Sequence, residues 1–259
     1  MVTCYPVAGK AKSLNICRAF ADGCQGSVAL AAPKLEPGPC FFYGVDASNA
    51  HLWNEAKADL RRDYYYCDNA FFDSTRQTYF RVARNRLQHS GRGKSDGKRF
   101  AALGIAIKPW RTMGEREHIV LCPQSDHFMR FVIGYDGCWQ VDMLDRLKHL
   151  LPRKFTMLPM VMVRKWSPDK GALAATLPDD LVNAYALVTY SSAAAVTAVL
   201  SGIPVVVQGQ SAAAPMSGTL EQIEALPMPE REEWCGVLAD AQWTLAEFRE
   251  GVAWRVLND

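Results

Sequence analysis

Residues 185–209, YALVTYSSAAAVTAVLSGIPVVVQG, decide the fold class of this 259-residue chain. The apolar run 186–190 predicts a strand that is buried on both faces. The small and apolar residues 193–200 predict a helix that can lie close on a sheet, and Gly202 is suited to end it. A second apolar run, 205–208, predicts the next strand. The stretch therefore predicts a β-α-β unit and a parallel sheet.

The turn of this unit carries two serines, Ser191 and Ser192, which are good helix N-cap residues. The helix begins where a strand ends, so free backbone N–H groups and the positive end of the helix dipole meet there. An anion such as a diphosphate could bind at this point. A packing unit without any ligand is an equally good interpretation, because β-α-β units are common.

The pattern T-Y-S-S-x-A-A-x-x-A-x-x-x-G-I-P-V-V-V, at residues 189–207, resembles the donor-binding half of GT-B glycosyltransferases. It is most similar to capsule-type sugar transferases and to glycosyltransferase-like proteins of bacteriophages. The resemblance implies an α/β fold of two Rossmann-like parallel-sheet halves with a cleft between them. It also implies a nucleotide-sugar donor, a nucleoside diphosphate sugar, with its pyrophosphate at Ser191 and Ser192.

The amino-acid composition of the chain is typical of a compact cytoplasmic protein. Hydrophobic residues make up 49% and charged residues 22%, as in ordinary soluble globules. The sequence has no apolar run of about 18 residues, the length that predicts a membrane span, and no signal-peptide pattern. The cysteines form no C-x-x-C pair, which favours reduced thiols over disulfides or a zinc site.

The alternation of predicted elements suggests three parts. Residues 1–115 are expected to form an acceptor-side domain with a basic insert at 76–111. Residues 116–228 are expected to form the donor domain. Residues 229–259 are expected to form C-terminal helices that pack back on the first domain.

The basic insert concentrates charge in a chain whose net charge is only +2. It holds ten Lys and Arg residues against one acid, whereas residues 221–259 hold nine acids and three bases. Segregation of this kind indicates a polyanionic partner, with DNA first and sugar-nucleotide phosphates second. A solvated surface loop remains an alternative. The expected nucleic-acid contacts are Arg81, Arg84, Arg92, Lys94, Lys98, Arg99 and Arg111.

Donor contacts are expected where other predicted strands of the second half end, since ligands of open α/β sheets gather at that edge. Gln124 and Ser125 follow the strand HIVLC, and Arg164 and Lys165 follow a strand that ends at residue 163. Gly209 ends the last strand of the opening stretch. The two cations would stabilise the diphosphate leaving group, with Arg81 and Arg84 as runners-up. Taken singly, each Arg is more often a plain surface charge.

A glycosyl transfer also needs a base for the acceptor hydroxyl. Asp68 follows the predicted strand 64–67 and ranks first, and Asp46 follows the strand CFFYGV. Asp68-Asn69 is also good turn chemistry, and Asp46 could instead cap a helix that starts near Ser48. His127 ranks third, because a lone His is more often structural.

The motifs that the sequence lacks narrow the set of possible functions. The chain lacks D-x-D, H-x-x-x-H and H-E-x-x-H, so a metal is not expected, and it lacks the G-x-S-x-G of many hydrolases. Hydroxymethylated bases in DNA are the expected acceptor, with a cell-surface polysaccharide or its lipid precursor as the alternative. A nucleic-acid-binding module without catalysis, a nucleotide-sugar epimerase and a donor hydrolase also remain open.

Overall fold

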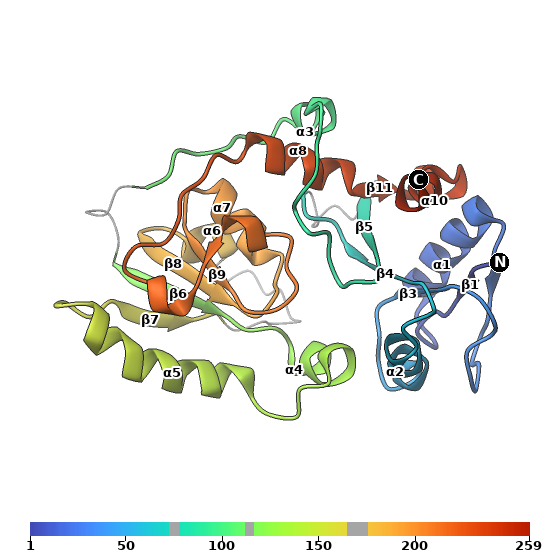
Figure 1. Cartoon of the computed structure of the whole chain (residues 1–259), viewed down its shortest axis with the longest axis horizontal. Coiled ribbons are helices and arrows are strands. Elements are labelled where there is room, and N and C mark those ends of the chain that lie inside the picture. The colour runs from blue at the N-terminus through green and yellow to red at the C-terminus, as the bar shows by residue number, and fades with distance from the viewer. Residues whose placement is uncertain (73–77, 112–116, 165–175) are drawn as a thin grey trace. The chain divides into compact units, whose positions relative to one another are not determined.

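The computed structural model describes residues 1–72, 78–111, 117–164 and 176–259. Within these residues the chain is an α/β protein with two sheets, each in its own compact unit (Figure 1). The first unit comprises Met1–His89, Arg130–Gly134 and Leu238–Asp259, and the second comprises Ser90–Met129 and Tyr135–Val237. The expectation of an α/β protein with two sheet regions is therefore confirmed.

The first sheet has six strands in the order β11-β5-β4-β3-β1-β2. These are β1 (Thr3–Cys4), β2 (Ser27–Val28), β3 (Cys40–Tyr43), β4 (Tyr64–Asn69), β5 (Tyr79–Arg84) and β11 (Gln242–Thr244). Strands β1 to β4 pair in parallel, but β5 is antiparallel to β4, and β11 is antiparallel to β5. The expectation of a purely parallel sheet is wrong for this half. The connection between Asn69 and Tyr79 is too short for a parallel crossover of a dozen or more residues.

The helices of the first unit are α1 (Ala11–Cys24), α2 (Ala50–Ala58), α9 (Leu245–Arg249) and α10 (Val252–Asn258), with a π-helix at Met129–Ile133. Helix α1 covers one sheet face, where the Phe20 and Phe41 rings stack at 4.1 Å. Gly23 permits α9 to approach, because a Cβ at Gly23 would lie 1.8 Å from the Phe248 carbonyl oxygen. The C-terminal segment thus belongs to the core of the first unit.

The second sheet is entirely parallel, in the order β10-β9-β8-β6-β7. Its strands are β6 (His118–Cys122), β7 (Met160–Val163), β8 (Ala184–Thr189), β9 (Val205–Val207) and β10 (Ser217–Gly218). Every residue of β6 and β8 is buried, as the apolar runs predict. The opening stretch forms β8, α7 (Ala194–Leu200) and β9, so the predicted β-α-β unit is confirmed.

The remaining helices of the second unit are α3 (Lys98–Ala102), α4 (Asp126–Phe128), α5 (Trp139–Lys154), α6 (Leu177–Asp180) and α8 (Glu232–Asp240), whose last residues belong to the first unit. Gly202 ends α7 with φ +76°, and its missing Cβ leaves room for the Pro109 carbonyl oxygen. The backbone N–H groups of Lys108 and Arg111 donate to Leu200 and Gly202. Residues 108–111 therefore pack on the second unit.

The compact units differ from the three expected parts at two places. The basic insert is divided, because β5 joins the first sheet while residues 90–111 group with the second unit. Close contacts explain this: a Cβ at Gly91 would lie 2.3 Å from the Ala212 carbonyl oxygen, and one at Gly236 would lie 2.6 Å from Ser95 Oγ. The expected C-terminal part, 229–259, is likewise divided after Val237.

Candidate functional site

The carboxyl ends of β6 and β8 meet in the second unit and are joined by Thr189. Its hydroxyl donates to the Cys122 carbonyl oxygen at 2.6 Å and accepts from the Ser192 backbone N–H at 3.3 Å. Thr189 is fully buried, so this link is shielded from water. The turn between β8 and α7 is thereby fixed against the end of β6.

Gln124 and the two serines come together at this edge. Gln124 Nε2 donates to Ser191 Oγ at 3.0 Å, and Ser191 is fully buried. Ser192 is half-buried, and its Oγ accepts from the Ala194 backbone N–H at 3.2 Å. Ser192 is therefore the more accessible of the two serines, whereas Ser191 holds Gln124 in place.

Gly209 lies against Tyr190, a contact that the sequence did not reveal. The Gly209 backbone N–H donates to the Tyr190 carbonyl oxygen at 2.7 Å, and a Cβ at Gly209 would lie 2.4 Å from the Tyr190 ring. Trp139 meets the same ring edge-on at 6.3 Å and donates its indole N–H to Gln208 Oε1 at 2.8 Å. Aromatic rings and an amide thus line the end of β9. The sequence offered one sign of these contacts, the polar residue Gln208 at the end of a predicted strand.

Ser125 and His127 occupy the short helix α4. Ser125 is its N-cap and accepts from the Phe128 N–H at 3.2 Å, which gives this side chain a structural duty. His127 is exposed on the same helix.

Arg164 follows β7 and lies near the same edge. Its guanidinium donates to the Asp180 carboxylate, and its backbone N–H donates to the Leu121 carbonyl oxygen at 2.8 Å. Burial raises the pKa of the Cys122 thiol, and the Arg164 charge and a hydrogen bond with Ser192 oppose that rise. Arg164 and Ser192 therefore both lie close to Cys122. Lys165 lies outside the described residues.

Asp68 lies within β4, in the first unit, rather than just after the strand. Its Oδ2 accepts from Arg81 Nη2 at 2.8 Å, and its Oδ1 accepts from the Asn69 N–H at 2.7 Å. The Asp68 side chain is 33% exposed and the Arg81 side chain 7%. The Asp68 carboxylate is therefore held in a fixed position and remains accessible to solvent.

Asp46 does not cap α2 with its side chain, because Asn49 is the N-cap of that helix and no side-chain cap bond forms. Its Oδ1 accepts from the Ser48 N–H at 2.8 Å and from the Ser48 hydroxyl at 2.5 Å. Its carbonyl oxygen accepts from the Asn49 and Ala50 N–H groups at the start of α2. Asp46 thus organises this turn.

Arg81 is not a surface cation, contrary to its expected contact with DNA. It is 6% exposed, and the Phe71 ring lies 4.9 Å from its guanidinium carbon. In the register of the sheet, Arg81 of β5 lies opposite Asp68 of β4 and opposite Gln242 of β11. Gln242, which the sequence reasoning missed, is fully buried and accepts from the N–H groups of Phe71 and Phe72.

Several other cations of the basic insert bind groups of the protein, although Lys94 and Lys98 remain exposed at the surface. Arg84 pairs with Asp63 at 2.7 Å, Lys94 with Glu233 at 3.0 Å and Lys98 with Asp96 at 2.7 Å. Arg111 Nη1 donates to the Leu181 carbonyl oxygen at 2.8 Å.

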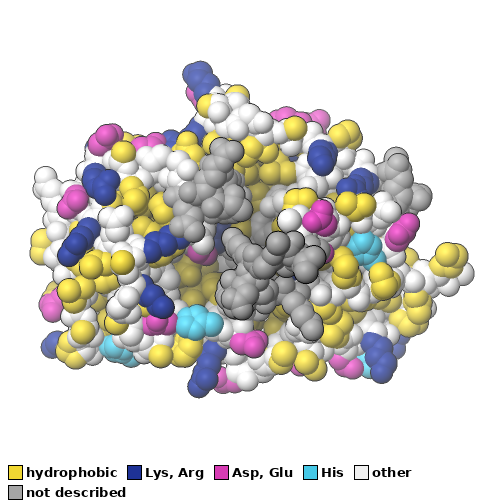
Figure 2. Space-filling view, turned by 180° about the vertical axis from the view of Figure 1, so that it is seen from behind, with side chains coloured by type: hydrophobic (Ala, Val, Ile, Leu, Met, Phe, Trp, Pro, Cys, Tyr) yellow, Lys and Arg dark blue, Asp and Glu magenta, His cyan; other side chains and the backbone are white. Residues whose placement is uncertain are grey.

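Arg99 is half-buried in α3, and Arg92 is exposed. On the face shown in Figure 2, Lys and Arg side chains are scattered among acidic and apolar ones. The ion pairs of the basic insert and the mixed charges on this face give no support to a continuous basic surface that could bind nucleic-acid phosphates.

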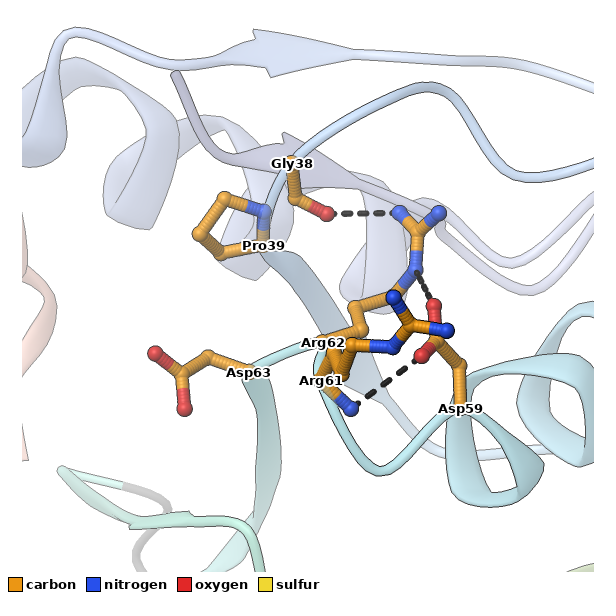
Figure 3. Close-up of a pocket in the computed structure, with 6 residues that line it drawn as sticks. All are labelled: Gly38, Pro39, Asp59, Arg61, Arg62 and Asp63. Atoms are coloured by element: carbon orange, nitrogen blue, oxygen red, sulfur yellow. Dashed lines mark hydrogen bonds and ion pairs between the residues drawn. The ribbon is translucent and has the colours of Figure 1, made fainter.

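A cavity of about 210 Å³ lies at the opposite, amino edge of the first sheet (Figure 3). Arg62 Nη1 donates there to the carbonyl oxygens of Glu36 and Gly38, each at 2.6 Å, and its Nε lies 3.6 Å from Asp59. These bonds tie the loop before β3 to the segment before β4. The cavity is a structural junction, away from the strand ends where ligands of such sheets gather.

Two further findings concern the described residues. They contain no group of three or more His, Cys, Asp or Glu side chains placed to hold a metal ion. None of their helices is both long and apolar enough to cross a membrane.

No protein-family model and no curated protein sequence matches the chain. Among solved structures, it is similar to the KpsC β-Kdo 2,7 transferase of Thermosulfurimonas dismutans, with a TM-score of 0.53 and 13% identity over 99% of this chain and 98% of that one. It is also similar to the KpsC β-Kdo 2,4 transferase of the same organism, with a TM-score of 0.54 and 12% identity over 93% and 92%. At such low identity the likeness shows a shared fold, and it gives no support to a link with phage DNA-modifying enzymes.

Proposed function

We propose that the protein is a GT-B-type glycosyltransferase that moves a sugar from a nucleotide-sugar donor to a hydroxyl group of a cell-surface polysaccharide or of its lipid precursor. The observation that carries the proposal is the likeness to two Kdo transferases over more than nine-tenths of each chain. Fold alone does not determine activity. The chemical argument for this activity comes from the residues at the carboxyl ends of the strands.

The second unit is the proposed donor side. Gln124, Ser125, Ser192 and Gly209 are proposed to surround the nucleotide diphosphate, and Ser191 is proposed to hold Gln124 in position. Charge for the leaving group is proposed to come from Arg164 and from Lys165, which lies outside the described residues. Hydrogen bonds to a charged phosphate oxygen contribute roughly 1.5–3 kcal/mol each.

The first unit is proposed to supply the base. Asp68 is the first candidate, because its carboxylate is fixed by Arg81 and the Asn69 N–H and is still one-third exposed. Asp46 comes second, because Ser48 already occupies its carboxylate. His127 comes third. Chemistry without a metal is part of the proposal and rests on the motifs of the sequence.

A polysaccharide is proposed as acceptor in place of DNA, because Arg81 is buried against Asp68 and because Arg84 and Arg111 bind groups of the protein itself. A duplex acceptor would require many free phosphate contacts and a base exposed from the stack. The described residues give no positive observation for either feature.

A thermal-shift panel of nucleotides and nucleotide sugars tests the donor. Nucleotide-activated Kdo comes first in the panel, because the two similar structures are β-Kdo transferases by description. A ligand at a hundred times its dissociation constant stabilises the protein by about 2.7 kcal/mol, so a true donor raises the melting temperature clearly.

Free nucleosides and free sugars serve as controls in the same panel, since they lack the diphosphate or phosphate link that the site is proposed to bind. The proposal fails if no nucleotide sugar raises the melting temperature more than these controls do.

A further inference from the structure

Lys12, in the first turn of α1, is a half-buried cation without a carboxylate partner. Its Nζ donates to Asn69 Oδ1 at 3.0 Å and lies 5.3 Å and 5.5 Å from the ring centroids of Tyr43 and Phe80. Among the described residues it forms no ion pair. Burial lowers the pKa of Lys12, and the Asp68 charge opposes that change. An amide oxygen and two ring faces thus hold the ammonium group at the carboxyl edge of the first sheet.

The start of α1 lacks the groups that normally stabilise a helix N-terminus. The helix has 14 residues, no acidic side chain in its first turn and no side-chain cap, and Lys10 stands at the N-cap. Positive charge at this pole is unfavourable, whereas an anion is favoured there. Ser13 accepts from the Val7 N–H at 3.0 Å and donates to the Tyr43 carbonyl oxygen at 2.9 Å, so it ties the preceding loop to β3 and leaves the first turn uncapped.

Arg81, the partner of Asp68 at this edge, has buried donor groups that its ion pair does not satisfy. It is 6% exposed and binds Asp68 through Nη2, but its Nε and Nη1 have no hydrogen-bond partner among the described residues. Buried donors without partners cost roughly 1–3 kcal/mol each. The cluster of Lys12, Asp68 and Arg81 carries two positive charges and one negative charge, and so has one positive charge in excess.

We propose that this edge of the first sheet binds an oxyanion, a phosphate or carboxylate group of a small molecule, through Lys12 and the first backbone N–H groups of α1. An ammonium group is a good point-charge ligand for phosphate, and a helix N-terminus adds oriented donors. The Arg81–Asp68 pair lets the anion approach, because Arg81 neutralises the carboxylate that would otherwise repel it. The site does not depend on the proposed donor chemistry and can exist without it.

A titration of the full chain with inorganic phosphate, and separately with acetate, tests the site by NMR of backbone amides at constant ionic strength. Saturable shifts are expected at the amides of Ala11, Lys12 and Ser13. Lys12→Met should weaken binding at least about tenfold, equivalent to about 1.4 kcal/mol. Lys10→Met is the matched control, because it removes the same charge from an exposed side chain two residues away, and binding should stay within about threefold.

Binding of phosphate alone would identify a phosphate ester as the ligand class, and binding of both anions would extend the class to carboxylates. Equal weakening by the two lysine variants would overturn the proposal, since it would indicate general charge attraction. Absence of saturable shifts with both anions would overturn it as well. If Lys12→Met does not fold, Lys12→Gln makes the same comparison, because it also removes the charge while keeping a flexible stem.

Discussion

The two sheets of this protein end in different chemistry. At the carboxyl edge of the second sheet, mostly neutral side chains bind one another, as Gln124 does with Ser191 and Trp139 with Gln208. At the same edge of the first sheet, charged side chains gather, and Lys12, Asp68 and Arg81 leave one positive charge in excess. The second unit therefore presents a prearranged hydrogen-bonding surface. The first unit presents an excess positive charge that an anionic ligand can neutralise.

The largest expected effect concerns the charged edge. Asp68→Asn should lower the rate of transfer by about 10²–10⁴, because the amide cannot accept the proton of the acceptor hydroxyl. Donor affinity, which is assigned to the other unit, should change little. Steady-state kinetics with a donor from the thermal-shift panel, together with donor titration, measures both quantities.

Asp46→Asn is the matched control for Asp68→Asn and should be milder, since Asp46 serves the turn at Ser48. An active Asp68 variant beside an inactive Asp46 variant would reverse the assignment. Two active variants would move the base to His127 or to the substrate.

The second effect concerns the neutral edge. The double variant Ser191→Ala with Ser192→Ala should weaken donor binding by roughly 1.5–3 kcal/mol, because it removes hydroxyls from the turn and leaves the Gln124 amide without its acceptor. Calorimetric titration of the donor measures the loss. The Ser192→Ala single variant separates direct contact from support, since its hydroxyl is the more accessible one. Unchanged affinity in the double variant would place the diphosphate elsewhere.

The third effect tests whether the C-terminal segment is integral to the first unit. Gly23→Ala should destabilise the protein by about 1–3 kcal/mol, because the new Cβ would collide with the Phe248 carbonyl oxygen in α9. Urea unfolding gives the free energy. Asn15→Ala, at an exposed position of the same helix, should change it by no more than about 0.5 kcal/mol. Equal stability of the two variants would show that α9 does not need this close contact.

The smallest expected effect concerns one ion pair in each unit, Asp63–Arg84 in the first and Asp96–Lys98 in the second. Hydrogen bonds from Arg84 and Asn85 lower the pKa of Asp63. A carboxyl group whose pKa is lowered by folding stabilises the protein above its unfolded pKa of about 3.9, and that stabilisation is lost as the pH falls through the folded value. Since the pair is about one-third exposed, Asp63→Asn should cost a few tenths to about 1 kcal/mol at pH 7 and less at pH 3.

Urea unfolding at the two pH values measures this difference. Asp96→Asn removes the exposed pair with Lys98 in the second unit and should have no measurable effect at either pH. A cost of Asp63→Asn that is the same at pH 3 as at pH 7 would contradict the ionic explanation.

The sequence determined most of the second unit. The strands at 118–122 and 184–189 and the helix at 194–200 follow from apolar runs, small residues and turn residues that are neighbours in the chain. Such local signals suffice, because a parallel β-α-β unit is built from one continuous segment. The contact between Gln124 and Ser191, in contrast, depends on the pairing of β6 with β8.

Tertiary structure decided the charged edge of the first unit, although two of its strands, β3 and β4, were predicted from the sequence. Strand β11 and its Gln242 come from the C-terminal part of the chain and pair with β5, which sets Gln242 beside Arg81. The separate pairing of β5 with β4 sets Arg81 beside Asp68. The sequence presented Arg81 as one cation of a basic segment. Whether a charged side chain faces solvent or a buried partner depends on strand order and on which face of the sheet it occupies, and both are fixed by contacts between residues far apart in the chain.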